Sequence, residues 1–230
     1  VYIGLNTVKH LALTAAAIGA IPTDETTGLD TETYLRHSLG AGIVCRRLGQ
    51  RVHIDDHGTA DLFVAGLLHD IGKVVFASFE PNSFRAAVAL AEVEDCEDFE
   101  AEYQIFGSDH AELGGLLASK WDFPNELAQA ITEHHQPVGY DTPTPLRDVV
   151  YLASAIMHRL KDLARHRQRL EQRAGAPSEE LETLPRQPSG VPEEPDLPAC
   201  ISAPQDLSID ELIAQMPGLD EELAHTQNFV

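Results

Sequence analysis

The chain has 230 residues, 43% of them hydrophobic, so it is long and apolar enough to fold around a substantial core. It carries 16 Lys and Arg against 37 Asp and Glu, a formal net charge of −21, and a field of that sign repels polyanions. This balance argues against direct binding of DNA or RNA, whereas solubility alone accounts for an acidic surface.

The three cysteines, Cys45, Cys96 and Cys200, are widely spaced and form no CxxC pair. The pattern therefore indicates neither a disulfide framework nor a zinc knuckle, and it favours a reducing, cytoplasmic location. The longest apolar stretch, residues 11–21, is about half the length of a membrane span, so we predict a core helix and no membrane association. Because the chain opens on Val1 within an apolar segment, we expect a piece of a longer polypeptide.

Apolar residues recur at intervals of three and four from residue 1 to about 165, and the last core helix is predicted to run to about 170, so we predict one all-α domain over 1–170. Asp109 and Glu112 have the spacing of a capping box at the start of one of its helices. Pro124 suits the first turn of a short helix that Pro137 closes, and Pro145 suits the first turn of the last core helix. The longer helices are predicted at about 3–20, 31–49, 60–78, 82–104 and 145–170.

The run EVEDCEDFEAE within 82–104 is most simply a solvent-exposed helix face. Residues 171–197 are rich in Pro, Ser and Glu and cannot bury much surface, so we predict a flexible linker. Residues 198–230 regain amphipathic spacing, which predicts one or two C-terminal helices that dock on the domain.

Four predicted helices each bring one histidine to an apolar face, namely His37, His69, His110 and His134. Asp70 follows His69 directly, and a buried carboxylate is costly unless it is paired or bound to a metal. Imidazole and carboxylate groups suit iron, zinc or manganese. Taken from the residues alone, a metal site and a purely structural His–Asp network both remain open.

Lys73 lies one helical turn after His69, where its ammonium could reach a phosphate beside a metal. A surface lysine that buries only its aliphatic stem is the other interpretation. Gly66 and Gly72 flank the His–Asp pair, and because glycine disfavours helix interiors we expect these two to allow a close approach by a neighbouring helix.

Four motifs in order resemble the HDOD branch of the HD superfamily of metal-dependent phosphohydrolases: HSLGAG from His37, GLLHDIGK, HAELGGLLASKWDFP from His110, and HHQP at 134–137. The resemblance covers about residues 3–165. It implies an HD-like, multi-helix bundle, here without the family's usual N-terminal helices, that serves as an output or scaffold module in bacterial signalling.

In catalytic relatives, the resemblance implies that His37, His69 and Asp70 hold one metal, with Asp70 bridging to a second. His110, with His134 or His135, would hold the second ion, and Lys73 would bind the phosphate.

The sequence departs from that pattern at Ser154, which stands where active relatives have a closing aspartate, so a divalent metal is possible and its absence equally so. Asp148 is predicted to face elsewhere and Asp141 to lie in a loop. The DGTGYP segment of cyclic-dinucleotide phosphodiesterases is also missing after HHQP.

Three functions follow as hypotheses. The first, favoured by Ser154, is a signalling module with weak or no catalysis that binds a signalling protein. The second is a metal-dependent phosphohydrolase acting on a nucleotide or cyclic dinucleotide, with Asp70 and Lys73 as catalytic residues. The third is a sensor that binds a nucleotide without hydrolysing it.

Overall fold

A computed structural model describes residues 15–17, 19, 21–22, 25–52, 54, 56–135, 145–173 and 209–226. Every regular element within these ranges is helical, which confirms the all-α prediction. The elements are η1 (Glu25–Thr27), α2 (Thr31–Arg51), α3 (Asp56–Leu68), α4 (Ile71–Phe79), α5 (Pro81–Glu94), α6 (Asp98–Phe106), α7 (His110–Lys120), α8 (Asn125–Thr132), α9 (Pro145–Arg173), α10 (Ile209–Ala214) and α11 (Leu219–Thr226).

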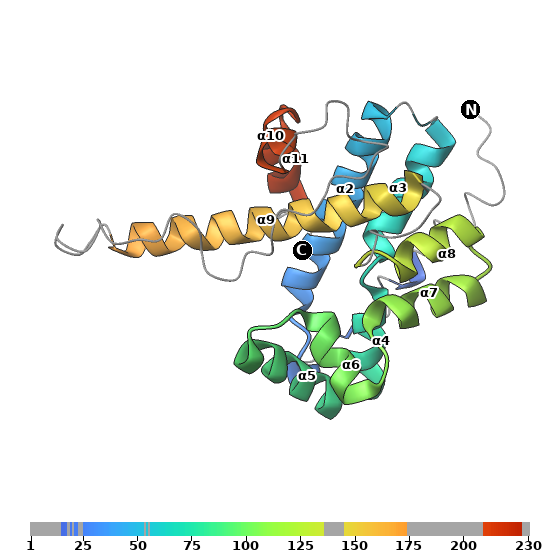
Figure 1. Cartoon of the computed structure of the whole chain (residues 1–230), viewed down its shortest axis with the longest axis vertical. Helices are drawn as coiled ribbons and strands as arrows, with labels where there is room; N and C mark the ends of the chain where they lie inside the picture. Colours follow the sequence, from blue (N-terminus) through green and yellow to red (C-terminus); the bar gives the residue numbers. More distant parts are fainter. Residues whose placement is uncertain are drawn as a thin grey trace.

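The core lies where α2 packs along α3 and the long helix α9 crosses them (Figure 1). Leu48, Leu62, Leu152 and Ile156 are fully buried there, and burial of each such side chain stabilises the fold by about 1.5–3 kcal/mol. Helices α4 to α7 form the lower part of the molecule in Figure 1, and the C-terminal end of α9 projects beyond the body. The site described below lies between α2, α4, α7 and the end of α8.

The single helix predicted over 60–78 is wrong, because α3 ends at Leu68 and α4 begins at Ile71. The His–Asp pair therefore occupies a turn. A Cβ at Gly66 would lie 2.7 Å from the carbonyl oxygen of Ala41, and one at Gly72 would lie 2.7 Å from the Cα atom of His110. The predicted close approach of neighbouring helices is thus confirmed at both glycines.

The acidic helix predicted over 82–104 is also two helices, α5 and α6. Asp95 separates them with a φ of 50° and a ψ of 46°, the left-handed conformation that commonly ends a helix. Glu97 and Glu100 then form a capping box at the start of α6. The face of this segment is only partly exposed to solvent, since the side chain of Glu102 is buried, with 2% of its surface exposed.

The predicted cap of α7 is confirmed, since the Asp109 carboxylate accepts a hydrogen bond from the Glu112 backbone N–H at 2.8 Å. Helix α8 starts one residue later than predicted, with Pro124 as its N-cap rather than in its first turn. Helix α9 begins at Pro145 as predicted and ends at Arg173. Pro137 lies outside the described residues, as do most of the helix predicted over 3–20 and the part of the predicted linker from 174 onward.

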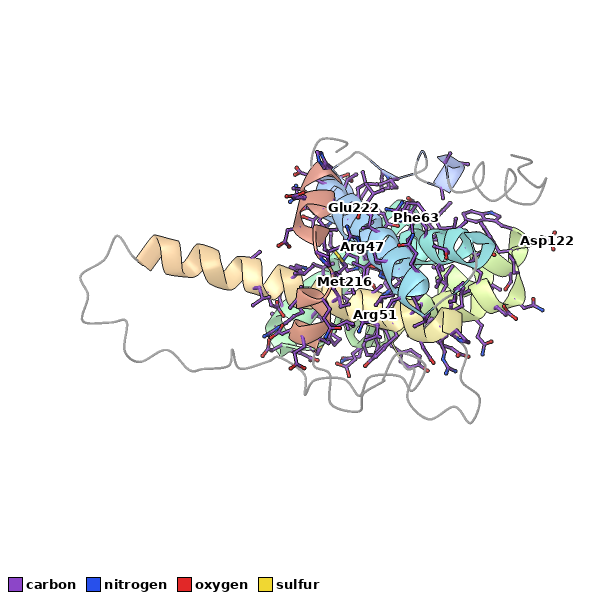
Figure 2. The ribbon with its side chains drawn as sticks, turned by 90° about the horizontal axis from the view of Figure 1, so that it is seen from above. Arg47, Arg51, Phe63, Asp122, Met216 and Glu222 are labelled. Carbon is purple, nitrogen blue, oxygen red and sulfur yellow. The ribbon has the colours of Figure 1, made fainter. Side chains whose placement is uncertain are left out.

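The C-terminal helices dock as predicted. Leu212 of α10 and Leu219 of α11 are buried against the domain. Arg47 of α2 donates to the Glu222 carboxylate at 2.7 Å and to the carbonyl oxygen of Pro217 at 2.9 Å. Figure 2 shows Arg47 and Glu222 together where the C-terminal helices meet α2.

The segment Gly58–Phe79 is long and apolar enough to cross a membrane, with a mean hydropathy of 1.6 over its most apolar window. Within the domain, 72% of that window is buried against other parts of the chain. A mostly buried core helix passes the same test of length and composition, and this segment is part of the core.

Candidate metal centre

Four imidazoles surround the carboxylate of Asp70. Their Nε2 atoms lie 3.7 Å (His37), 3.5 Å (His69), 3.1 Å (His110) and 3.6 Å (His134) from an Asp70 oxygen. His69, His110 and His134 are at most 1% exposed, and Asp70 is 4% exposed. The structure therefore brings together the four histidines that the sequence placed on separate apolar faces.

These five residues come from four separate parts of the chain. His37 lies in the second turn of α2, and His69 and Asp70 form the turn between α3 and α4. His110 is the first residue of α7, and His134 follows the end of α8. The site thus depends on the packing of the whole bundle and on no single element.

The Nδ1 atoms of two imidazoles each face a backbone carbonyl oxygen, which can only accept a hydrogen bond. The His69 Nδ1 lies 2.7 Å from the Gly66 carbonyl, and the His134 Nδ1 lies 2.6 Å from the Ile131 carbonyl. Carbonyl oxygens require a proton on Nδ1, which leaves Nε2 free to present its electron pair to the centre. This arrangement is common among metal-ligating histidines.

Two groups of ligand atoms are compact enough to hold an ion, with all atoms of each group within 4.8 Å of one another. The first group is His37, His69 and Asp70, and the second is His110, His134 and His135. The His37 and His69 Nε2 atoms are 3.1 Å apart, close to the roughly 3.0–3.4 Å between neighbouring nitrogens on a metal with bonds of about 2.0–2.1 Å.

An unsatisfied atom in the centre points the same way. The His134 Nε2 is buried without a hydrogen-bond partner, since its 3.6 Å distance to Asp70 is too long for one. A buried polar atom without a partner costs free energy, and a metal would satisfy it. The residues present therefore fit a divalent ion.

The electrostatics favour neutral imidazoles in the first group. Burial lowers the pKa of His37 well below its usual range and that of His69 to about 3. Burial would raise the pKa of Asp70, but its interactions with His69, Lys73 and His110 outweigh burial and hold that pKa well below its usual range. A neutral imidazole and an ionised carboxylate are the forms that bind metals.

His110 differs from the other imidazoles. Burial and the charge of Lys73 disfavour its protonation, but the Asp70 and Glu102 carboxylates outweigh them and raise its pKa to about 9. In the metal-free protein it is therefore a cation between two carboxylates.

Lys73 is an internal cation of the site. Its Nζ atom lies 3.2 Å from Asp70 and 3.0 Å from Asp98, and only 14% of its side chain is exposed. Burial would lower the pKa of Lys73, but the two carboxylates raise it, so the ammonium persists at neutral pH.

Four residues around the site were missed by the sequence reasoning. On α6, Asp98 pairs with Lys73, the Phe99 ring stacks on His135 with centroids 4.5 Å apart, and Glu102 contacts His110. On α9, the exposed ring of His158 lies 5.3 Å from that of His37, centroid to centroid. No local pattern distinguishes these four residues from exposed ones, because their partners lie elsewhere in the chain.

Ser154, the predicted departure from the active pattern, is 6% exposed on α9, one helical turn before His158. The guanidinium of Arg147 pairs with the Asp148 carboxylate at 3.0 Å. Asp141 lies outside the described residues.

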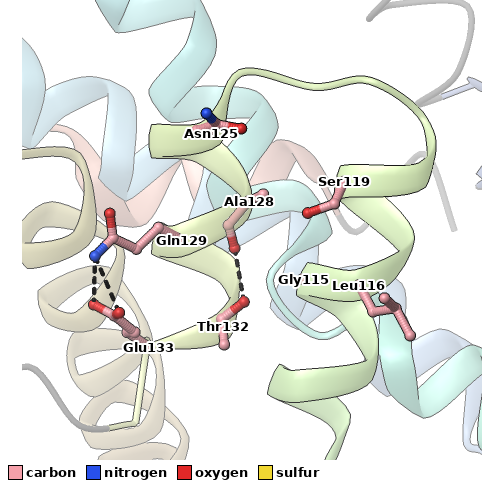
Figure 3. Close-up of a pocket in the computed structure, with 8 residues that line it drawn as sticks. All are labelled: Gly115, Leu116, Ser119, Asn125, Ala128, Gln129, Thr132 and Glu133. Atoms are coloured by element: carbon pink, nitrogen blue, oxygen red, sulfur yellow. Dashed lines mark hydrogen bonds between the residues drawn. The ribbon is translucent and has the colours of Figure 1, made fainter.

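The larger of two cavities lies away from the centre. A depression of about 400 Å³ between α7 and α8 (Figure 3) is lined by Gly115, Leu116, Ser119, Asn125, Ala128, Gln129, Thr132 and Glu133, none of which belongs to the cluster. A second cavity, of about 20 Å³, reaches Lys73, Asp98 and Glu102.

Comparison with known proteins identifies the family. Residues 1–137 match the model of the HDOD domain. The chain belongs to the HDOD family. The structure of an HDOD domain protein of unknown function from Geobacter sulfurreducens has the same fold, with a TM-score of 0.64 and 21% identity over 99% of this chain and 72% of that one.

A candidate phosphohydrolase from Shewanella amazonensis SB2B is also similar to this HDOD domain. Its TM-score is 0.57 and its identity 25%, over 66% of this chain and 55% of that one. An uncharacterised protein of Treponema pallidum (strain Nichols) is 29% identical over 96 residues, which are 41% of this chain and 19% of that protein. The chain spans under a fifth of the length of the curated relatives it matches.

Proposed function

We propose that this HDOD domain is a signal-output module with weak or no catalytic activity, whose His/Asp cluster holds a divalent metal. The observation that carries this proposal is the closure of the cluster. Among the described residues, the cavity that reaches Lys73 measures about 20 Å³, whereas pockets for small ligands occupy roughly 300–1,000 Å³. This cavity is too small for a nucleotide, which also disfavours the sensor hypothesis.

In this proposal, His37, His69 and Asp70 would hold one ion of iron, manganese or zinc. His110, His134 and His135 would hold a second, with Asp70 between the two groups. The buried Nε2 of His134 supports a metal over a purely structural network. The cluster would fix α2, the α3–α4 turn and α7 relative to one another, and a cytoplasmic signalling protein would bind the helical surface.

Metal-dependent phosphohydrolysis is the alternative. The position of Lys73, 3.2 Å from Asp70, favours it, as does the similarity to the candidate phosphohydrolase. A bound metal would then polarise a phosphoryl oxygen. Lys73 would hold the phosphate, and Ser154 would leave the site one anionic ligand short.

Metal analysis and a hydrolysis assay separate these functions. We expect the purified chain to contain a stoichiometric amount of iron, manganese or zinc, and the Asp70→Ala variant to contain none. Cyclic dinucleotides and bis(p-nitrophenyl) phosphate, offered with added Mn²⁺, should be hydrolysed no faster by the wild type than by Asp70→Ala. Turnover above that control would establish the hydrolase, and a metal-free wild type would leave only the structural network.

A further inference from the structure

Glu102 is a buried carboxylate outside both groups of ligand atoms. It lies in the second turn of α6 and is 2% exposed. Its Oε2 atom accepts a hydrogen bond from the backbone N–H of His110 at 2.7 Å and lies 2.6 Å from the Nδ1 atom of the same residue. One oxygen of Glu102 therefore contacts His110 twice.

Two physical reasons explain a carboxylate at this point. His110 is the first residue of α7, so its backbone N–H has no acceptor within its own helix. The start of a helix also attracts negative charge. An ionised Glu102 satisfies that N–H and at the same time requires a proton on Nδ1, because a carboxylate only accepts hydrogen bonds.

We propose that Glu102 is a positioning residue, which holds the His110 imidazole with its Nε2 atom toward Asp70 and so sets the affinity of the cluster for a divalent metal. The inference rests on the proposed metal binding. The His110 Nε2 lies 3.1 Å from Asp70 and 2.8 Å from the Nε2 of His135, at the junction of the two groups. A rotation of this one ring would disturb both groups.

The Nδ1 partner of His110 is a side chain, whereas the Nδ1 partners of His69 and His134 are backbone carbonyl oxygens. His69 and His134 direct their Nδ1 atoms to carbonyl oxygens three residues earlier in the chain, Gly66 and Ile131. Those acceptors are fixed by the path of the chain and carry no charge. Glu102 is charged, so it makes His110 a more basic ligand, and it comes from a separate helix.

The surrounding contacts of α6 reinforce this role. Asp98, one turn before Glu102, binds Lys73, and Phe99 stacks on His135. One helix thus contacts three residues of the centre without supplying a ligand to either group. Glu102 is the contact that is both buried and in direct reach of a ligand nitrogen.

The test compares Glu102→Gln, which keeps the shape, and Glu102→Ala with wild type in the full chain. Glu92→Gln, at an exposed position on α5, is the matched control. Zn²⁺ affinity is measured by chelator competition, and Co²⁺ absorption reports the ligand geometry. We expect Glu102→Gln to weaken Zn²⁺ binding about 10–100-fold, as loss of such a support typically does, and Glu92→Gln to match wild type.

Histidine ¹⁵N NMR supplies a readout that a merely structural role would not change. The His110 Nδ1–H proton should be protected from exchange in wild type and lost in Glu102→Ala. Unchanged Zn²⁺ affinity and an unchanged Co²⁺ spectrum in Glu102→Gln would overturn the inference. A wild type that binds no Zn²⁺ would overturn the metal site and the affinity effect together, whereas binding with an unprotected Nδ1–H would overturn the positioning alone.

Discussion

Substitution of Gly72 by alanine tests whether the close approach of α4 to α7 holds the metal centre together. A Cβ at this position would lie 2.7 Å from the Cα and 2.8 Å from the carbonyl carbon of His110, and it would overlap the carbonyl oxygen. Ordinary contact begins at 3.4 Å, so the two helices must separate by at least about 0.7 Å. Backbone atoms cannot move aside as a flexible side chain can.

The expected loss of stability follows from that overlap. Overpacking costs about 1–3 kcal/mol, and a backbone neighbour places Gly72→Ala near the upper end. The higher helix propensity of alanine offsets up to about 1 kcal/mol. A net loss of about 2 kcal/mol should lower the Tm of a chain of this size by about 4–8 °C.

The same separation should weaken metal binding. It would stretch the 3.1 Å distance between the His110 Nε2 and Asp70 beyond hydrogen-bond range. Because ligand sites must be held to within about 0.5 Å, we expect the Zn²⁺ affinity of Gly72→Ala to fall about tenfold or more.

Gly40→Ala on α2 is the matched control. Its Cβ would lie 2.8 Å from the Sδ atom of Met157 and would overlap the terminal methyl group, which is the far end of a flexible side chain. This variant should stay within about 1 kcal/mol of wild type. Thermal unfolding and Zn²⁺ titration of both variants decide the matter. If Gly72→Ala is as stable as Gly40→Ala and binds Zn²⁺ equally well, the close approach does not position His110.

Leu212→Ala should destabilise the chain by about 2–5 kcal/mol in urea unfolding, since this α10 side chain is fully buried, and no loss would mean that the C-terminal helices do not contribute to the fold. The hydrogen bond from Arg159 lowers the pKa of Asp210, so its contribution is fully present above the unfolded pKa of about 3.9 and is lost as pH falls toward the folded value. Asp210→Asn should therefore cost stability at pH 6, by under about 1 kcal/mol because the pair is partly exposed, and less at pH 3; an equal cost at both pH values would contradict the assignment. Lys73→Met removes a cation 3.2 Å from Asp70 and should tighten Zn²⁺ binding while it destabilises the metal-free chain; weaker binding would mean that Lys73 supports the metal site and does not compete with the ion.

The sequence predicted the fold class because helical periodicity is a local property. The four histidines could be placed on apolar faces for the same reason, and their convergence follows once each face packs inward. The helix break at His69 and Asp70 could not be predicted, because no proline interrupts the sequence there. It accompanies a tertiary contact, the approach of Gly72 to His110.

The contact of α6 with the metal centre could not be predicted from the sequence for a related reason. Glu102 stands in a run of acidic residues, and local composition does not distinguish a buried carboxylate from an exposed one. The partners of the buried Glu102 carboxylate are the backbone N–H and the Nδ1 atom of His110, which lies eight residues later on another helix. The interpretation of that run as a solvated face was therefore correct for its exposed neighbours and wrong for the residue nearest the centre.

The sequence left a structural network and a metal site as rival interpretations, but the geometry allows the same residues to form both. Asp98, Lys73, Asp70, His110 and Glu102 form an unbroken series of contacts in which acidic and basic groups alternate. Such alternation lets a metal-free cluster keep several charges buried, because each has a partner of opposite sign. Lys73 and His110 each contact a second carboxylate, Asp98 and Glu102 respectively. A metal that binds Asp70 would therefore leave each of them with a carboxylate partner.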